Sequence, residues 1–156
     1  MQPLVPSRSR HGGRRASRGF TLIETLIVVG IAGVLSSLAY PSLEGQVLRA
    51  RRSDALVSLM QAQLAQERHR ANHRSYGDLA EIGLRGSSLS GYYTVQVTAS
   101  STDSYELVAT AAGRQAHDAT CQTLRLSVAG AGLVYASGPD ATASNPDTVN
   151  RKCWNQ

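Results

Sequence analysis

An apolar run from Phe20 to Tyr40, with Glu24 as its single charge, constrains this chain more than any other feature. About 21 residues correspond to roughly 30 Å of α-helix, which matches the hydrocarbon core of a bilayer. A carboxylate in such a segment costs roughly 2.5 to 3.5 kcal/mol at mid-membrane, and less near the end of the helix. We therefore expect residues 20–40 to form a membrane helix in which the acid has a function.

The segment before this run, residues 1–19, is basic and rich in Gly, Ser and Pro. Its five arginines have no acidic residue among them: Arg8, Arg10, Arg14, Arg15 and Arg18. The positive-inside rule keeps these charges in the cytoplasm and sends the rest of the chain across the membrane. The segment has too little apolar surface to fold, so we expect a disordered leader. The other 11 of the 16 basic residues balance the 11 acidic residues, so the chain from Phe20 onward is formally neutral.

An ordinary secretory signal peptide is the simplest alternative for the N-terminus. Ser37-Leu38-Ala39 would serve as its small-x-small cleavage site. The apolar run is longer than the roughly 7 to 15 residues usual for such peptides. It also contains Glu24, so the membrane anchor is favoured.

The residues Arg18-Gly19-Phe20-Thr21-Leu22-Ile23-Glu24, followed by the apolar run, resemble the prepilin signature of the type IV pilin family. The resemblance implies that a prepilin peptidase removes the leader after Gly19 and that Phe20 becomes an N-methylated N-terminus. It also implies that Glu24 is an assembly charge. The implied partners are other pilins, the prepilin peptidase, the inner-membrane assembly machinery and the inner membrane itself.

The spacing of four residues between the Glu24 carboxylate and the new amine of Phe20 has a chemical reason in a filament. Glu24 lies one helical turn from the amine of Phe20, and in an apolar filament core it is less costly when it faces a neighbour's amine. Glu24 would then set the axial register between subunits. Two alternatives stay open, namely that it pairs with its own amine or reaches the lipid headgroups.

Residues 41–74 continue the helix with an amphipathic pattern. Leu48, Ala55, Leu59 and Ala62 recur at helical spacing, and charged residues, Arg52 among them, are assigned largely to other faces. Gly33 and Pro41 favour a bend or local melting between the two halves, because glycine and proline weaken helices and matching positions loosen in pilin filaments.

Residues 75–91 form a Gly and Ser-rich connecting loop, with one short turn around residues 78–82. Residues 92–156 contain period-two apolar alternation in three segments near 93–97, 105–109 and 124–128, and a fourth strand is expected at 133–135. The predicted fold class is α+β: a long N-terminal helix packed on a four-stranded antiparallel sheet, the pilin fold.

The two cysteines, Cys121 and Cys153, suit an oxidising compartment and are predicted to form a disulfide. Such a bridge would stabilise the domain by roughly 3 to 4 kcal/mol and hold the C-terminal tail against the sheet. It resembles the C-terminal disulfide-bounded loop of pilins. Cys153-Trp154 and Gly91-Tyr92-Tyr93-Thr94 most resemble the PilE-like minor pilins.

A basic cluster ends the long helix, and its cations complement the negative end of the helix dipole. Arg68, Arg70 and Arg74 are the best candidates for weak DNA contact. His69 and His73 have helical spacing for a metal, but no third ligand stands at a recognisable distance. The loop of residues 138–147 carries oxygen donors without the spacing of a calcium loop. We therefore expect no metal, no cofactor and, without catalytic motifs, no enzyme.

The predicted function is that of a minor type IV pilin incorporated into or priming pilus fibres, which serve twitching motility, adhesion and DNA uptake. The first alternative is a DNA-binding minor pilin that acts as a competence receptor. The second is a pseudopilin of a type II secretion system, which the cysteine pair disfavours. The expected location is the inner membrane as a single-pass precursor with a periplasmic C-terminal domain, and then the pilus.

Overall fold

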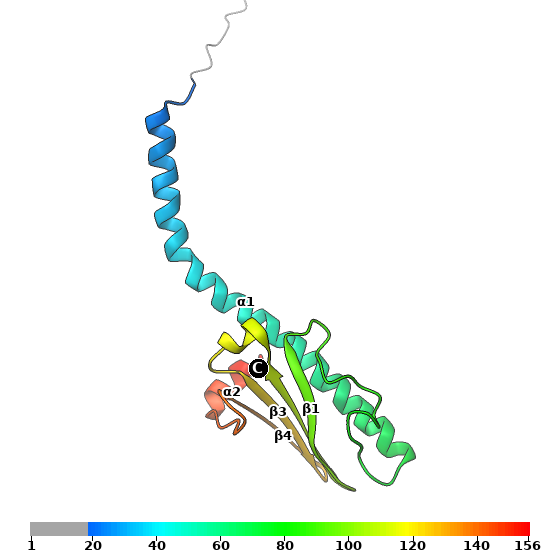
Figure 1. Ribbon diagram of the computed structural model, residues 1–156. Helices are drawn as coiled ribbons and strands as arrows, with labels where there is room; N and C mark the ends of the chain where they lie inside the picture. The colour runs from blue at the N-terminus through cyan, green and yellow to red at the C-terminus, as the bar shows by residue number, and fades with distance from the viewer. Residues whose placement is uncertain (1–18) are drawn as a thin grey trace, which may run out of the picture. The chain divides into compact units, whose positions relative to one another are not determined.

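The computed structural model describes residues 19–156, so most of the predicted leader lies outside the described residues (Figure 1). The elements follow in the order α1, β1, β2, η1, β3, β4, α2. The chain divides after Ala39 into two units, which are described separately. This order confirms the predicted α+β class.

Helix α1 spans Leu22–Asn72, and its part up to Leu38 belongs to the first unit. Apolar side chains on all sides of this part are exposed, from 56% for Ile27 to 78% for Leu22. By length and composition, no single helix in residues 19–156 qualifies alone as a membrane span. The segments Leu22–Leu38 and Leu43–Asn72 qualify only when taken together.

In the second unit, α1 buries one stripe of side chains against the sheet. Ala55, Leu59 and Ala62 are fully buried, as the amphipathic pattern predicted. The same stripe continues to Arg52 and Gln66, which are 7% and 0% exposed. The assignment of Arg52 to a polar face was therefore wrong, because its three-residue spacing from Ala55 places it on the buried side.

The sheet has four antiparallel strands in sequential order: β1 (Tyr93–Ser100), β2 (Ser104–Ala111), β3 (Thr123–Ala129) and β4 (Gly132–Gly138). The predicted alternation is confirmed, because its residues point into one core. The buried strand residues of that core are Tyr93, Val95, Tyr105, Leu107, Ala109, Leu124 and Leu126. All core residues and both cysteines lie between residues 55 and 154, so this unit has a complete core of its own.

Two short helices were not anticipated. The 3-10 helix η1 (Gly113–His117) connects β2 to β3, and α2 (Asp147–Cys153) lies in the tail, where contacts with β4 hold it. The connecting loop contains the expected turn. Asp78 and Glu81 stabilise it, since the side chain of each accepts a hydrogen bond from the other's backbone N–H, at 2.8 and 2.9 Å.

Candidate functional site

The predicted processing residues Gly19 and Phe20 lie just before α1, which begins at Leu22. Phe20 is 81% exposed, and the Thr21 hydroxyl oxygen accepts a hydrogen bond from the backbone N–H of Glu24 at 3.2 Å. Thr21 therefore caps the helix and Glu24 lies in its first turn, where the helix dipole favours a negative charge. The Thr-x-x-Glu pattern that signals such a cap was present in the sequence and was not used.

The rest of the first unit presents an apolar surface with satisfied hydroxyl groups. Ser36 and Ser37 donate hydrogen bonds to the carbonyl oxygens of Ala32 and Val34, at 2.8 and 2.7 Å. These bonds suit a helix in lipid or in a packed bundle, where unpaired polar groups are costly. Gly33 and Pro41 both lie within α1, and their proposed loosening stays a prediction about the filament.

The opposite end of α1 carries the predicted basic cluster. Arg68 and Arg74 are exposed, whereas Arg70 is half-buried and donates to the carbonyl oxygens of Thr102 and His73, at 3.0 and 3.2 Å. Of the three proposed DNA contacts, Arg68 and Arg74 are therefore the freer ones. The rings of His69 and His73 stack with their centroids 3.9 Å apart.

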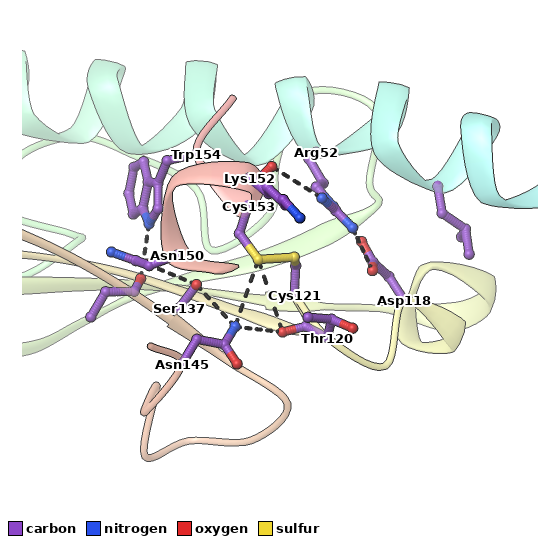
Figure 2. The surroundings of a disulfide bond; sticks show 12 residues. Arg52, Asp118, Thr120, Cys121, Ser137, Asn145, Asn150, Lys152, Cys153 and Trp154 are labelled. Carbon is purple, nitrogen blue, oxygen red and sulfur yellow. Dashed lines mark hydrogen bonds and ion pairs between the residues drawn. A yellow bond between two sulfur atoms is a disulfide. The ribbon is translucent and has the colours of Figure 1, made fainter. Parts of the chain in front are cut away.

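The predicted disulfide between Cys121 and Cys153 is present, with the two Cα atoms 5.6 Å apart (Figure 2). Asn145 donates to the carbonyl oxygen of Thr120 at 2.8 Å, and Asn150 donates to that of Tyr135 at 2.8 Å. These bonds join the tail to the loop before β3 and to β4. The disulfide and these hydrogen bonds therefore hold the same C-terminal tail against the sheet.

A buried ion pair next to the disulfide joins α1 to the same region. Arg52 Nε and Nη2 donate to the two carboxylate oxygens of Asp118, at 2.6 and 2.8 Å, and Nη1 donates to the carbonyl oxygen of Lys152 at 3.2 Å (Figure 2). Asp118 and Lys152 lie within three residues of the two cysteines. Arg52 therefore contacts both sides of the bridge, and sequence analysis missed this role.

Gln115 extends this polar network into the core. Its side-chain amide donates to the carbonyl oxygen of Leu48 and to the hydroxyl oxygen of Tyr93, both at 3.0 Å. Burial raises the pKa of Tyr93 to about 12. The hydrogen bonds of Gln115 keep η1 against α1, and burial, not the bond from Gln115, raises the pKa of Tyr93.

The metal candidates do not form a site within residues 19–156, where no group of three or more His, Cys, Asp or Glu side chains could hold an ion. In the loop after β4, the Thr142 hydroxyl donates to Asp140 at 2.6 Å and lowers the pKa of that carboxyl group. This contact makes a local turn.

Two family models match the chain. One describes a prokaryotic N-terminal methylation motif and covers residues 14–40. The other describes the type IV minor pilin ComP, DNA uptake sequence receptor, and covers residues 41–125, more than half of the chain. The two matches divide the chain close to the boundary between its two structural units.

Several curated relatives are similar to parts of the chain. The type IV major pilin PilA of Myxococcus xanthus is 39% identical over 69 residues, which cover 44% of this chain and 31% of that protein. The type II secretion system core protein G of Pectobacterium carotovorum is 36% identical over 68 residues, covering 44% of this chain and 43% of that protein. The chain thus spans less than half the length of these relatives.

The type IV wide pilus major component PilA4 of Thermus thermophilus is 32% identical over 97 residues, and the match covers 61% of this chain and 74% of that protein. This match and the two family models agree with the N-terminal signature, the long helix and the antiparallel sheet. The chain belongs to the type IV pilin family and, within it, to the minor pilins of the ComP type.

Proposed function

We propose that the protein is made as an inner-membrane precursor, is cut after Gly19, and enters type IV pilus fibres as a minor subunit with Phe20 as its mature N-terminus. The observation that carries this proposal is the exposed apolar surface on all sides of Leu22–Leu38. About 25 cal/mol is gained per Å² of apolar surface removed from water. Such a surface therefore requires a lipid or protein environment, and neighbouring pilins provide it after the subunit leaves the membrane.

In this proposal Glu24 acts only in the filament. It is exposed in the first turn of α1, so the amine of a neighbouring subunit can reach its carboxylate. In the membrane the same charge carries a desolvation cost and lies near the end of the helix. The proposal therefore separates two effects of this residue: insertion does not need the charge, and assembly does.

The test compares Glu24→Gln with Glu44→Gln, in which a half-buried acid of the second unit changes instead. Glu24→Gln should leave the amount of precursor in the membrane unchanged or raised, and should reduce the protein in sheared pili several-fold. Glu44→Gln should change neither quantity. A wild-type amount of Glu24→Gln in sheared pili would show that this acid is not an assembly charge.

The mature N-terminus tests the processing step separately. Mass spectrometry of the membrane-bound protein should find N-methylated Phe20 as the first residue. If Tyr40 were the first residue, the N-terminus would have been removed as an ordinary secretory signal peptide. That result would contradict cleavage after Gly19.

DNA capture is the second candidate function, and the family description as a DNA uptake sequence receptor favours it. The candidate surface is the end of α1, where Arg68 and Arg74 are exposed and Arg70 already donates to two carbonyl oxygens. Two or three phosphate contacts give a salt slope of about −2 to −3 and weak nonspecific affinity. We therefore expect DNA contact to be secondary to filament assembly.

Fluorescence anisotropy with the domain 43–156 and labelled duplex DNA tests this expectation. Binding should be weak near 150 mM salt and should disappear when Arg68, Arg70 and Arg74 become alanine. A control variant with Arg85→Ala and Arg151→Ala, which removes two cations elsewhere, should retain it. Submicromolar affinity with preference for one sequence would make DNA reception the main function.

A further inference from the structure

We propose that the part of the second unit that follows the anchor in the chain binds the headgroups of anionic phospholipids. Four cationic side chains define this basic collar: Arg49, Arg51, Arg114 and Lys152. Arg49, Arg114 and Lys152 are exposed, and Arg51 is half-buried. The inference rests on the proposed membrane-anchored precursor and adds a specific lipid contact to it.

The collar comes from three elements that internal contacts hold at one level of α1. η1 is fixed there because Gln115 donates to the carbonyl oxygen of Leu48 at 3.0 Å. α2 is fixed there because Arg52 donates to the carbonyl oxygen of Lys152 at 3.2 Å. In Figure 1, η1 lies beside the part of α1 that follows the unit boundary. The backbone positions that carry these cations are therefore brought together before any ligand binds.

Two hollows lie between these cations. The first, of about 260 Å³, is lined by the apolar side chains of Leu43 and Val47, by Arg51 and Arg114, and by the acidic side chain of Glu44. The second, of about 500 Å³, is lined in part by Arg49 and Lys152. In the first hollow, apolar side chains beside cations fit a phospholipid, whose phosphate and acyl chain meet at such a boundary.

The collar has few acidic neighbours that could neutralise it. Asp118 is already paired with Arg52 inside the domain, so its carboxylate does not neutralise the collar cations. Glu44 lies 3.7 Å from Arg114, but this pair is open to solvent, since the Arg114 side chain is 72% exposed. An exposed pair of this kind is weak and exchanges readily for another anion.

Chain connectivity keeps the collar close to a membrane surface. Arg49 follows Tyr40 by nine residues, which span roughly 14 Å as a helix and about 30 Å when fully extended. The positive-inside rule disfavours cations on this side of the anchor, although the five leader arginines outweigh them. A cationic array at this place suits an anionic partner, and the bilayer that holds residues 20–40 supplies one.

Each cation near an anionic membrane surface strengthens binding about fivefold. The test uses the mature full chain in neutral detergent and counts bound lipids by native mass spectrometry during titration with phosphatidylglycerol or phosphatidylcholine. The wild-type chain should prefer phosphatidylglycerol. Changing the four collar residues to glutamine should weaken that preference at least tenfold.

The matched control changes four cations elsewhere in the same unit to glutamine: Arg68, Arg70, Arg74 and Arg85. It should keep the wild-type lipid preference. Equal losses in both variants, or no preference in the wild type, would overturn the proposal. The single variants Arg49→Gln and Lys152→Gln should each weaken phosphatidylglycerol binding several-fold. Because both positions are exposed, these variants test the proposal even if the fourfold variant does not fold.

Two further arms identify the ligand. Inorganic phosphate at about 10 mM should not displace phosphatidylglycerol, because it gains nothing from the apolar side chains of the first hollow; displacement would indicate a small-anion site and refute lipid recognition. Loss of duplex DNA binding by the collar variant, with lipid preference intact, would also refute it. Since these measurements use purified protein, a failure leaves the Glu24 result on filament entry unaffected.

Discussion

The buried pair of Arg52 and Asp118 should be among the most sensitive polar contacts of the domain. Both residues are less than 10% exposed, and two hydrogen bonds of 2.6 and 2.8 Å join them. In Arg52→Met, Asp118 keeps only the side-chain amide of Gln115 as a donor, at 3.4 Å. Removing one partner of a buried pair costs about 3 to 5 kcal/mol, because the remaining charge is left without compensation. We expect a loss of that size.

The double variant Arg52→Met/Asp118→Leu separates the missing contact from the stranded charge. With both charges replaced by apolar groups, at least half of the lost stability should return. Arg114→Met is the matched control, because it breaks an exposed pair with Glu44 at 3.7 Å and should cost about 0 to 1 kcal/mol. Urea unfolding of the oxidised domain 43–156, as wild type and as the three variants, gives the four free energies of unfolding by linear extrapolation.

Two results would refute this reasoning. A loss below about 1 kcal/mol in Arg52→Met would mean that water compensates Asp118, as at a surface pair. A double variant no more stable than Arg52→Met would mean that the hydrogen bonds themselves, including the one to Lys152, carry the stability.

Two other predictions concern the covalent bridge and alkaline pH. Thiol labelling of the native protein should find neither Cys121 nor Cys153 free without reduction, and Cys153→Ser should destabilise the domain by about 3 to 4 kcal/mol in urea unfolding; free thiols would contradict this. Burial raises the pKa of Tyr93 to about 12, whereas an unfolded tyrosine titrates near 10. The unfolded state therefore loses its proton first, so stability should fall from about pH 10 to 12. Tyr93→Phe should reduce that slope, and an unchanged slope would exclude Tyr93 as a cause.

The sequence predicted the parts of the fold that repeat locally. A helix with one apolar stripe and strands with period-two alternation each carry a signal within a few residues, as at Ala55 and Leu59 or at Tyr105 and Leu107. The disulfide was predictable because the chain has only two cysteines. The first helical turn was also encoded, since Thr21 and Glu24 form a capping pattern.

The contacts around Arg52 were not predicted, because their partners are distant in sequence. Asp118 is 66 residues away and the Lys152 carbonyl is 100 residues away. A charged residue is usually placed on the solvent side of an amphipathic helix, and that assumption failed here. Spacing alone would have identified the exception, since Arg52 and Gln66 continue the stripe of Ala55, Leu59 and Ala62 at intervals of three and four residues.

The helix α2 was missed for a different reason. Seven residues are too few to be stable alone, and the segment is held by contacts made only in the folded domain. The indole N–H of Trp154 donates to the carbonyl oxygen of Ala136 at 3.0 Å, and its ring lies 4.6 Å from that of Tyr135. Tertiary packing therefore determines this helix, and its sequence carries only a weak local signal.

Equal numbers of acids and bases after Phe20 led to the expectation of weak DNA contact at one local patch, formed by Arg68, Arg70 and Arg74. The structure shows why a net count is a weak guide to local charge. Asp118 is used internally by Arg52, and Glu106 lies 3.6 Å from Arg125 at the sheet. Acids that are paired inside the domain do not neutralise cations at its ends. Anion binding must therefore be judged at each end of α1 separately, which is why DNA and lipid binding call for different charge variants.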